Sequence, residues 1–210
     1  MRIISVTQKD DRNVSIVLDN EKVLFLSNEI FMKSGLRKGN EISEDLFSSL
    51  VEENRSFFLK QKAFRYLGRR LHSVKELRLK LRRKDCDDRL IELVVEELKD
   101  KNYLNDYDFA VQFTDENIKN KLWGRAKLES ELRKKGIERE IIDEVLREKL
   151  TGESEAENAV LLLQKKLETL DIKKSNEEKT KLKLINYLAG KGYDYDAIRQ
   201  AVEECLKGHG

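Results

Sequence analysis

Lys60-Gln-Lys-Ala-Phe-Arg-Tyr-Leu-Gly-Arg-Arg-Leu-His-Ser-Val-Lys-Glu-Leu-Arg-Leu-Lys-Leu-Arg-Arg-Lys84 is a strongly basic stretch, and an acidic segment follows it as far as Leu98. Glu76 is the only acid in the basic stretch, and Arg89 is the only base between residues 85 and 97. The pattern predicts a helical hairpin with one basic and one acidic limb, because apolar residues recur at helical spacing in both halves. These residues are Val74, Leu77, Leu81, Leu90, Ile91, Val94, Val95 and Leu98.

The hairpin recurs twice further along the chain, at a spacing of about fifty residues that is typical of helical repeats. Two leucines mark the second helix of each copy: Leu77 and Leu81, Leu128 and Leu132, Leu184 and Leu188. One alanine marks the helix before each copy: Ala63, Ala110 and Ala159. We therefore expect a mainly α protein made of three tandem three-helix repeats in an elongated, curved array. The predicted repeats span residues 56–104, 105–150 and 151–210.

Residues 1–55 are predicted to form a β-rich segment with a short helix. Three short β-branched runs separated by turn-forming residues indicate an antiparallel meander of three strands. Such a small sheet needs support, so its apolar face should pack on Ile30, Phe31 and a helix from about Ser43 to Lys62. The predicted strands are Ile3–Val6, Val14–Leu18 and Val23–Leu26.

Several helix ends are marked by residues that cap them. Ser73 followed by Glu76 is a capping box, and so is Ser175 followed by Glu178. Asp87 and Asp88 should open the third helix of the first repeat, and Gly136 should end the second helix of the second repeat.

Composition favours a binding protein over an enzyme. The two histidines, His72 and His209, have no partners at metal-ligand spacing, and no phosphate-binding glycine loop is present. We expect Cys86 and Cys205 to behave as small apolar residues in a reduced protein. No catalytic residue, metal or cofactor is predicted. The longest apolar run, Ala159–Leu163, is too short for a membrane span, so we expect no membrane partner. We also expect the protein to be cytoplasmic and monomeric.

Three motifs together resemble the RecX family, bacterial modulators of the RecA recombinase. They are Tyr66–Leu77, Tyr103-Leu-Asn-Asp106 with Phe109-Ala110, and Glu131–Ile137. The resemblance covers about residues 56 to 207 and implies tandem three-helix repeats without enzymatic activity. It also implies a protein that lies in the groove of the RecA–DNA filament and mainly inhibits RecA, lowering ATP hydrolysis, strand exchange and co-protease activity.

The candidate binding residues are basic side chains that recur in the first two repeats, here called the basic face. Lys75, Arg78 and Arg82 form a stripe beside the apolar row of their helix. Two aromatic residues, Tyr66 and Trp123, are candidate anchors: the core is the favoured place for Tyr66, and neither place is favoured for Trp123. The basic face comprises Arg65, Arg69, Arg70, Lys75, Arg78, Arg82, Arg83, Lys84, Arg125, Lys127, Arg133, Lys134 and Lys135.

A basic face of this kind has more than one use. It suits an acidic protein groove or the phosphates of single- or double-stranded DNA, reached directly or through RecA. The alternative to a RecA modulator is therefore a DNA-binding helical-repeat protein that acts without RecA. An adaptor for some other partner would need apolar surface, of which the sequence offers little.

Overall fold

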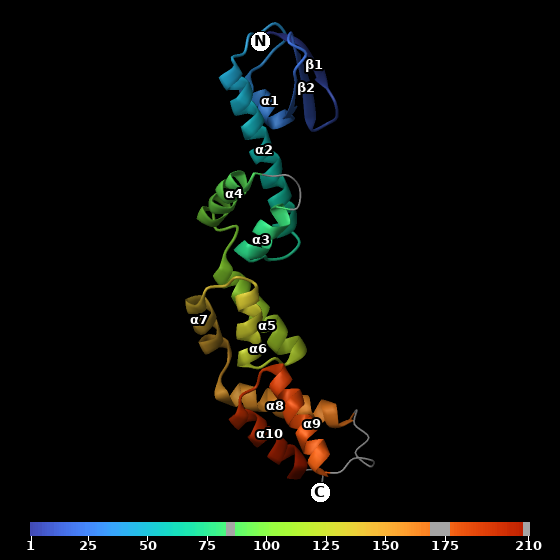
Figure 1. The fold of residues 1–210 in the computed structure, drawn as a ribbon, viewed down its shortest axis with the longest axis vertical. Coiled ribbons are helices and arrows are strands. Elements are labelled where there is room, and N and C mark those ends of the chain that lie inside the picture. The colour runs from blue at the N-terminus through green and yellow to red at the C-terminus, as the bar shows by residue number, and fades with distance from the viewer. Residues whose placement is uncertain (83–86, 169–176, 208–210) are drawn as a thin grey trace. The chain divides into compact units, whose positions relative to one another are not determined.

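A computed structural model describes residues 1–82, 87–168 and 177–207 of the chain (Figure 1). Within these ranges the protein is mainly helical, with a small sheet at the N-terminus, as predicted. Its backbone divides into two compact units, Met1–Arg70 with Leu77–Lys101 and Leu71–Glu76 with Asn102–Gly210. The elements are β1 (Ile3–Gln8), β2 (Asn13–Leu18), β3 (Val23–Ser27), α1 (Asn28–Ser34), α2 (Glu44–Leu67), α3 (Val74–Leu81), α4 (Asp88–Asp100), α5 (Asp106–Lys121), α6 (Arg125–Lys134), α7 (Arg139–Lys149), α8 (Gly152–Glu168), α9 (Glu177–Lys191) and α10 (Tyr195–Lys207).

The three N-terminal strands form the expected antiparallel meander in the order β1-β2-β3. Ile16 pairs with Val6 on one side and with Leu24 on the other. Side chains of alternate residues therefore share one face, which packs on Ile30 of α1 and Leu50 of α2 in a common core. The prediction that this face would pack on these two helices is confirmed.

Helix α2 is longer than predicted from the sequence. It starts after Ser43, whose side chain accepts a hydrogen bond from the Leu46 amide, and runs without interruption to Leu67. The predicted boundary between residues 55 and 56 thus falls inside one helix, because no proline or glycine interrupts its sequence. The remaining boundaries and the arrangement of the repeats as an array stay predictions.

The residues that mark the repeats are among the best-buried ones in the helices. The paired leucines of the second helices and the alanines of the first helices each have an exposed fraction of 0%. In each repeat the first helix packs on the third: α2 on α4, α5 on α7 and α8 on α10. The fully buried markers are Leu77, Leu81, Leu128, Leu132, Leu184, Leu188, Ala63, Ala110 and Ala159.

The predicted helix ends are found where the chain is described. The Ser73 hydroxyl accepts a hydrogen bond from the Glu76 amide at 3.1 Å. The Asp87 side chain accepts one from the Arg89 amide, and Gly136 follows α6 with a φ of +82°. The predicted cap at Ser175 lies outside the described residues, as do Cys86 and His209.

His72 and Cys205 are both buried in the second unit. Burial raises the pKa of the Cys205 thiol, which suits the small apolar role predicted for it. His72 is 2% exposed, so it belongs to the interior of the structure.

Two glycines bring the second and third repeats together within the second unit. The Gly124 amide donates to the Lys191 carbonyl at 2.9 Å, and the Ala126 amide donates to the Gly192 carbonyl at 3.0 Å. Gly192 has a φ of +89°, and a Cβ placed on it would lie 2.2 Å from the Lys127 amide nitrogen. Because Gly124 has no side chain to cap α6, these carbonyls satisfy amides that the helix leaves free.

The residues that open α3 make an equivalent contact in the same unit. The Ser73 hydroxyl donates to the Lys135 carbonyl at 2.7 Å. A Cβ placed on Gly136 would lie 2.6 Å from the Cδ atom of Lys75. Lys135-Gly136 and Lys191-Gly192 therefore serve as the same joint in successive repeats, which we call the lysine-glycine joint.

Candidate interaction surface

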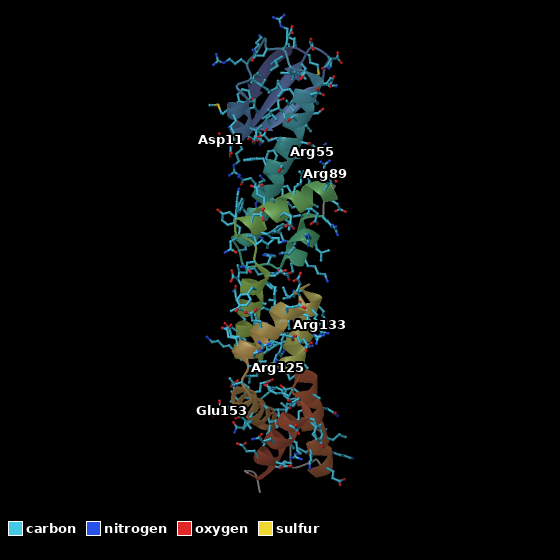
Figure 2. All side chains as sticks on the ribbon, turned by 90° about the vertical axis from the view of Figure 1, so that its left-hand side faces the viewer. Asp11, Arg55, Arg89, Arg125, Arg133 and Glu153 are labelled. Carbon is cyan, nitrogen blue, oxygen red and sulfur yellow. The ribbon has the colours of Figure 1, made fainter. Side chains whose placement is uncertain are left out.

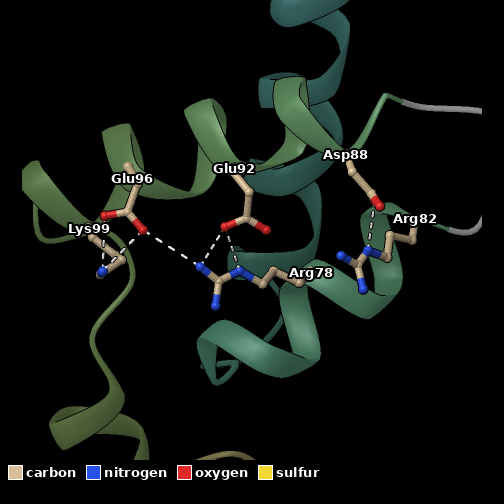
Figure 3. A network of polar contacts seen from close by, with 6 residues as sticks. All are labelled: Arg78, Arg82, Asp88, Glu92, Glu96 and Lys99. Atoms are coloured by element: carbon tan, nitrogen blue, oxygen red, sulfur yellow. Dashed lines mark hydrogen bonds and ion pairs between the residues drawn. The ribbon is translucent and has the colours of Figure 1, made fainter.

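The basic limb of the first hairpin is paired with its acidic limb (Figure 3). Arg78 donates to one Glu92 carboxylate oxygen from Nη2 at 2.6 Å and from Nε at 2.9 Å. Its Nη2 also lies 3.6 Å from Glu96. Just after the end of α3, Arg82 Nε donates to Asp88 at 2.8 Å. Helix α4 thus presents its carboxylates to Arg78 of α3 and to Arg82, which follows that helix.

These ion pairs leave the arginines available for exchange. The side chain of Arg78 is 33% exposed and that of Arg82 is 50% exposed. Exposed ion pairs contribute only about 0–1 kcal/mol, because water and salt screen the charges. A polyanion that offers several negative charges can therefore compete for both arginines.

Three further cations of the basic face lie in the last turn of α2 or just after that helix. Arg65 and Arg69 are exposed, and neither makes an ion pair with the side chains that the structure describes. Arg70 is exposed beside them. Arg65 and Arg69 are therefore the part of the basic face that offers its charge most directly. Arg83 and Lys84 of the predicted face lie outside the described residues.

Helix α6 carries most of the basic face in the second repeat, with Arg125 at its start and Arg133 near its end (Figure 2). Arg133 pairs with Glu129, and the Arg125 guanidinium donates to the Leu146 carbonyl at 3.1 Å. Lys75, on α3, is exposed and packs its stem against Gly136 of the joint.

One carboxylate holds two lysines of α6. Glu131 lies 2.8 Å from Lys134 and 3.4 Å from Lys127. The hydrogen bond from Lys134 lowers the pKa of Glu131 most, and Lys127 lowers it further. Lys135 pairs with Glu76 at 2.5 Å. Every predicted cation of the second repeat therefore already has a partner, and only weak surface pairs restrain most of them.

The two candidate anchors, Tyr66 and Trp123, are half-buried, so neither is wholly core nor wholly surface. The Lys80 ammonium lies 5.0 Å from the centre of the Tyr66 ring. Trp123 packs on Phe113 with ring centres 6.3 Å apart, and the Lys121 ammonium lies 4.4 Å from the Trp123 ring centre.

A third aromatic ring, that of Tyr187, also has lysine ammonium groups beside it, and this ring was not predicted from the sequence. Tyr187 on α9 has the ammonium of Lys166 at 5.3 Å and that of Lys191 at 5.6 Å from its ring centre. The Lys191 ammonium also lies 3.5 Å from the Lys121 carbonyl oxygen. The available signal was the pair Lys191-Gly192, which repeats Lys135-Gly136 and so marks a joint that brings distant lysines together.

Among the residues that the structure describes, no group of three or more His, Cys, Asp or Glu side chains is arranged to hold a metal ion. None of the helices described is both long enough and apolar enough to cross a lipid bilayer.

Comparison with known proteins identifies the repeats. The sequence models of the first, second and third three-helix domains of RecX match residues 60–98, 105–146 and 153–202. This chain belongs to the RecX family. The three RecX matches fall in the order of the three repeats and cover more than half of the chain.

Curated RecX relatives match over almost their full length. "Regulatory protein RecX" of Clostridioides difficile (strain 630) is 30% identical over 203 residues, which are 97% of this chain and 94% of the relative. The protein of that name from Clostridium botulinum (strain Alaska E43 / Type E3) is 29% identical over the same shares. The relatives are thus named as regulatory proteins.

Solved RecX structures share the fold. The "Crystal structure of regulatory protein RecX" has a TM-score of 0.75 at 22% identity and covers 99% of this chain and 98% of its own. The RecX structure from Lactobacillus salivarius has a TM-score of 0.65 at 24% identity and covers 74% of this chain and 99% of its own. At these identities the likeness concerns the fold.

Proposed function

We propose that this chain regulates the RecA recombinase, mainly as an inhibitor, by binding in the groove of the RecA–DNA filament. Membership of the RecX family, with all three helical repeats matched, is the observation that carries the proposal. Bound there, the protein obstructs a second DNA strand and lowers ATP hydrolysis, strand exchange and co-protease activity. It acts by occupying a surface and performs no catalysis of its own.

The charges of the basic face support this mode of binding. Arg65 and Arg69 offer charge without an internal ion pair to a described side chain, whereas Arg78 and Arg82 must exchange one partner for another. Such exchange costs little for exposed pairs, so each repeat contributes a weak contact and the contacts add along a polymer. Binding that rests on many exposed charges is sensitive to salt.

Co-sedimentation with RecA filaments on single-stranded DNA tests the proposal. The wild-type chain should pellet with the filaments, and the double variant Arg65→Gln/Arg69→Gln should need several-fold more protein for the same bound fraction. Arg55→Gln is the matched control, because Arg55 is an exposed arginine of α2, the helix that also carries Arg65 (Figure 2). A chain that stays in the supernatant at low salt would refute the proposal, and equal binding by both variants would refute the role of Arg65 and Arg69.

Direct binding to nucleic acid is a second candidate function. The observation that favours it is the half-buried ring of Trp123 with lysines beside it, since aromatic rings and basic side chains together bind single strands. This function would operate without RecA.

A further inference from the structure

We propose that the joint between the second and third repeats is a binding site for single-stranded nucleic acid, in which bases stack on Trp123 and Tyr187. We call the set Lys121, Trp123, Lys127, Lys166, Tyr187 and Lys191 the joint cluster. The proposal rests on the second candidate function, direct binding to nucleic acid, and deepens it by naming the site and the kind of strand that the site would take.

The fold places the cluster by two backbone features. Leu122 ends α5 in the left-handed region with a φ of +49°, and its side chain lies in the core of the third repeat. The Leu122 carbonyl accepts a hydrogen bond from the Tyr193 hydroxyl at 3.0 Å. Burial raises the pKa of Tyr193. Trp123 is therefore anchored on its N-terminal side to the third repeat while its ring packs on Phe113 of the second.

The lysine-glycine joint at Lys191-Gly192 then brings lysines from different helices close to the two aromatic rings. Gly192 allows backbone contact with Lys127, so the preceding residue, Lys191, reaches the end of α5. The Trp123 ring has Lys121 at 4.4 Å and Lys127 at 5.7 Å. Lys191 connects this group to the Tyr187 ring at 5.6 Å. Positive charge and aromatic rings from α5, α6, α8 and α9 thus form one continuous group.

The chemistry of the cluster suits a phosphate polymer that also carries bases. An ammonium over an exposed ring contributes less than a base that stacks on the same ring. When phosphates draw the lysines away from the rings, a base can take the place of the ammonium. A polymer with phosphates alone would satisfy the lysines but leave the rings uncovered.

Glu131 of α6 and Glu155 of α8 are two carboxylates near the cluster, and both already have partners. Glu131 pairs with Lys127 at 3.4 Å and shares its charge with Lys134. Glu155 accepts a hydrogen bond from the Arg125 amide at 3.0 Å, so its carboxylate is engaged at the start of α6. Glu131 thus competes with a phosphate for Lys127 of the cluster.

Intrinsic fluorescence tests the proposal directly, because Trp123 is the only tryptophan of the chain. The full chain is titrated at low salt, without RecA, with oligothymidylate and with an abasic oligomer of the same number of phosphates. Oligothymidylate should quench the emission of Trp123, and the abasic oligomer should quench it much less. Equal quenching by both, or none by oligothymidylate, would overturn the proposal.

Lysine variants locate the site. Lys121→Gln and Lys191→Gln should each weaken binding several-fold and lower the salt slope by roughly 0.7 for each phosphate that the variant no longer neutralises. Lys119→Gln is the matched control, since Lys119 is an exposed lysine of the same helix as Lys121. Affinities for Lys121→Gln and Lys191→Gln that match the Lys119→Gln control would overturn the assignment.

A gain-of-function variant guards against loss through misfolding. Glu131→Gln removes the acid that competes for Lys127, so it should tighten binding to oligothymidylate. Unchanged or weaker binding would contradict the role given to Lys127. Because RecA is absent from these titrations, their failure would leave the co-sedimentation result intact, and the reverse also holds.

Discussion

The Ser73 hydroxyl accepts a hydrogen bond from the Glu76 amide and donates one to the Lys135 carbonyl at 2.7 Å. One side chain therefore caps α3 and also holds the loop after α6. Loss of a cap costs about 1 kcal/mol, and the carbonyl left without a donor adds about 1 kcal/mol or more. Ser73→Ala should lower the free energy of unfolding by about 2 kcal/mol, measured by urea denaturation. Ser130→Ala, at an exposed position of α6, should change it by less than about 0.5 kcal/mol.

Gly192 and Gly190 lie close together in the sequence, but substitution by alanine should change the free energy of unfolding in opposite directions at these two positions. Gly192→Ala places a Cβ on a residue with positive φ and against backbone atoms of Lys127, so we expect a loss of about 2–4 kcal/mol. Gly190 lies inside α9 with open space around it, and Gly190→Ala should stabilise the protein by up to about 1 kcal/mol. Urea denaturation measures the free energy of unfolding of both variants. Changes of the same sign would contradict the close backbone contact assigned to Gly192.

Charge reversal on the basic face should separate Arg78, which has ion-pair partners, from Arg65, which pairs with no described side chain. Arg78→Glu would place a third carboxylate beside Glu92 and Glu96, so it should lower the melting temperature by a few degrees. Arg65→Glu should leave it nearly unchanged. Thermal unfolding followed by circular dichroism measures both. Equal melting temperatures would show that the α3–α4 ion pairs contribute nothing to stability.

The repeat pattern made most of the fold predictable. The spacing of Leu77 and Leu81, repeated at Leu128 and Leu132, identified residues that prove to be fully buried. Such side chains leave a strong period in the sequence because burial permits only apolar residues at those positions. Caps such as Ser73 were predictable for a similar reason, since few residue types serve there.

The candidate site was less predictable. The acidic limb after the basic stretch gave a signal for the pair of Arg78 with Glu92, because facing helices of opposite charge pair with each other. The joint cluster gave a weaker signal, since Lys121 and Lys191 meet only through the backbone of Gly192 and α6. Contacts between distant segments depend on packing, which local patterns do not record.

Acid should weaken the contribution of Glu131 to stability. Its lysine partners hold its pKa below the ordinary value of 4.5, so the folded state favours the charged form. The stabilisation is present above pH 4.5 and is lost as the pH falls through the lowered pKa of the folded state. Glu131→Gln should therefore show a smaller loss of stability between about pH 5 and about pH 2.5 than the wild type.

The control for this acid dependence is Glu140→Gln. Glu140 is exposed in the first turn of α7 and pairs with no described lysine or arginine. Denaturant unfolding at several pH values gives the free energy for each variant. Parallel pH profiles for the wild type and Glu131→Gln would contradict the assigned stabilisation.

The most direct test of the proposed regulation is the rate of ATP hydrolysis by RecA on single-stranded DNA, titrated with this chain at two salt concentrations. We predict that hydrolysis falls as the chain is added, and that the higher salt concentration shifts the midpoint to more protein. A rate that stays constant in the presence of excess chain at the lower salt concentration would contradict the proposed inhibition.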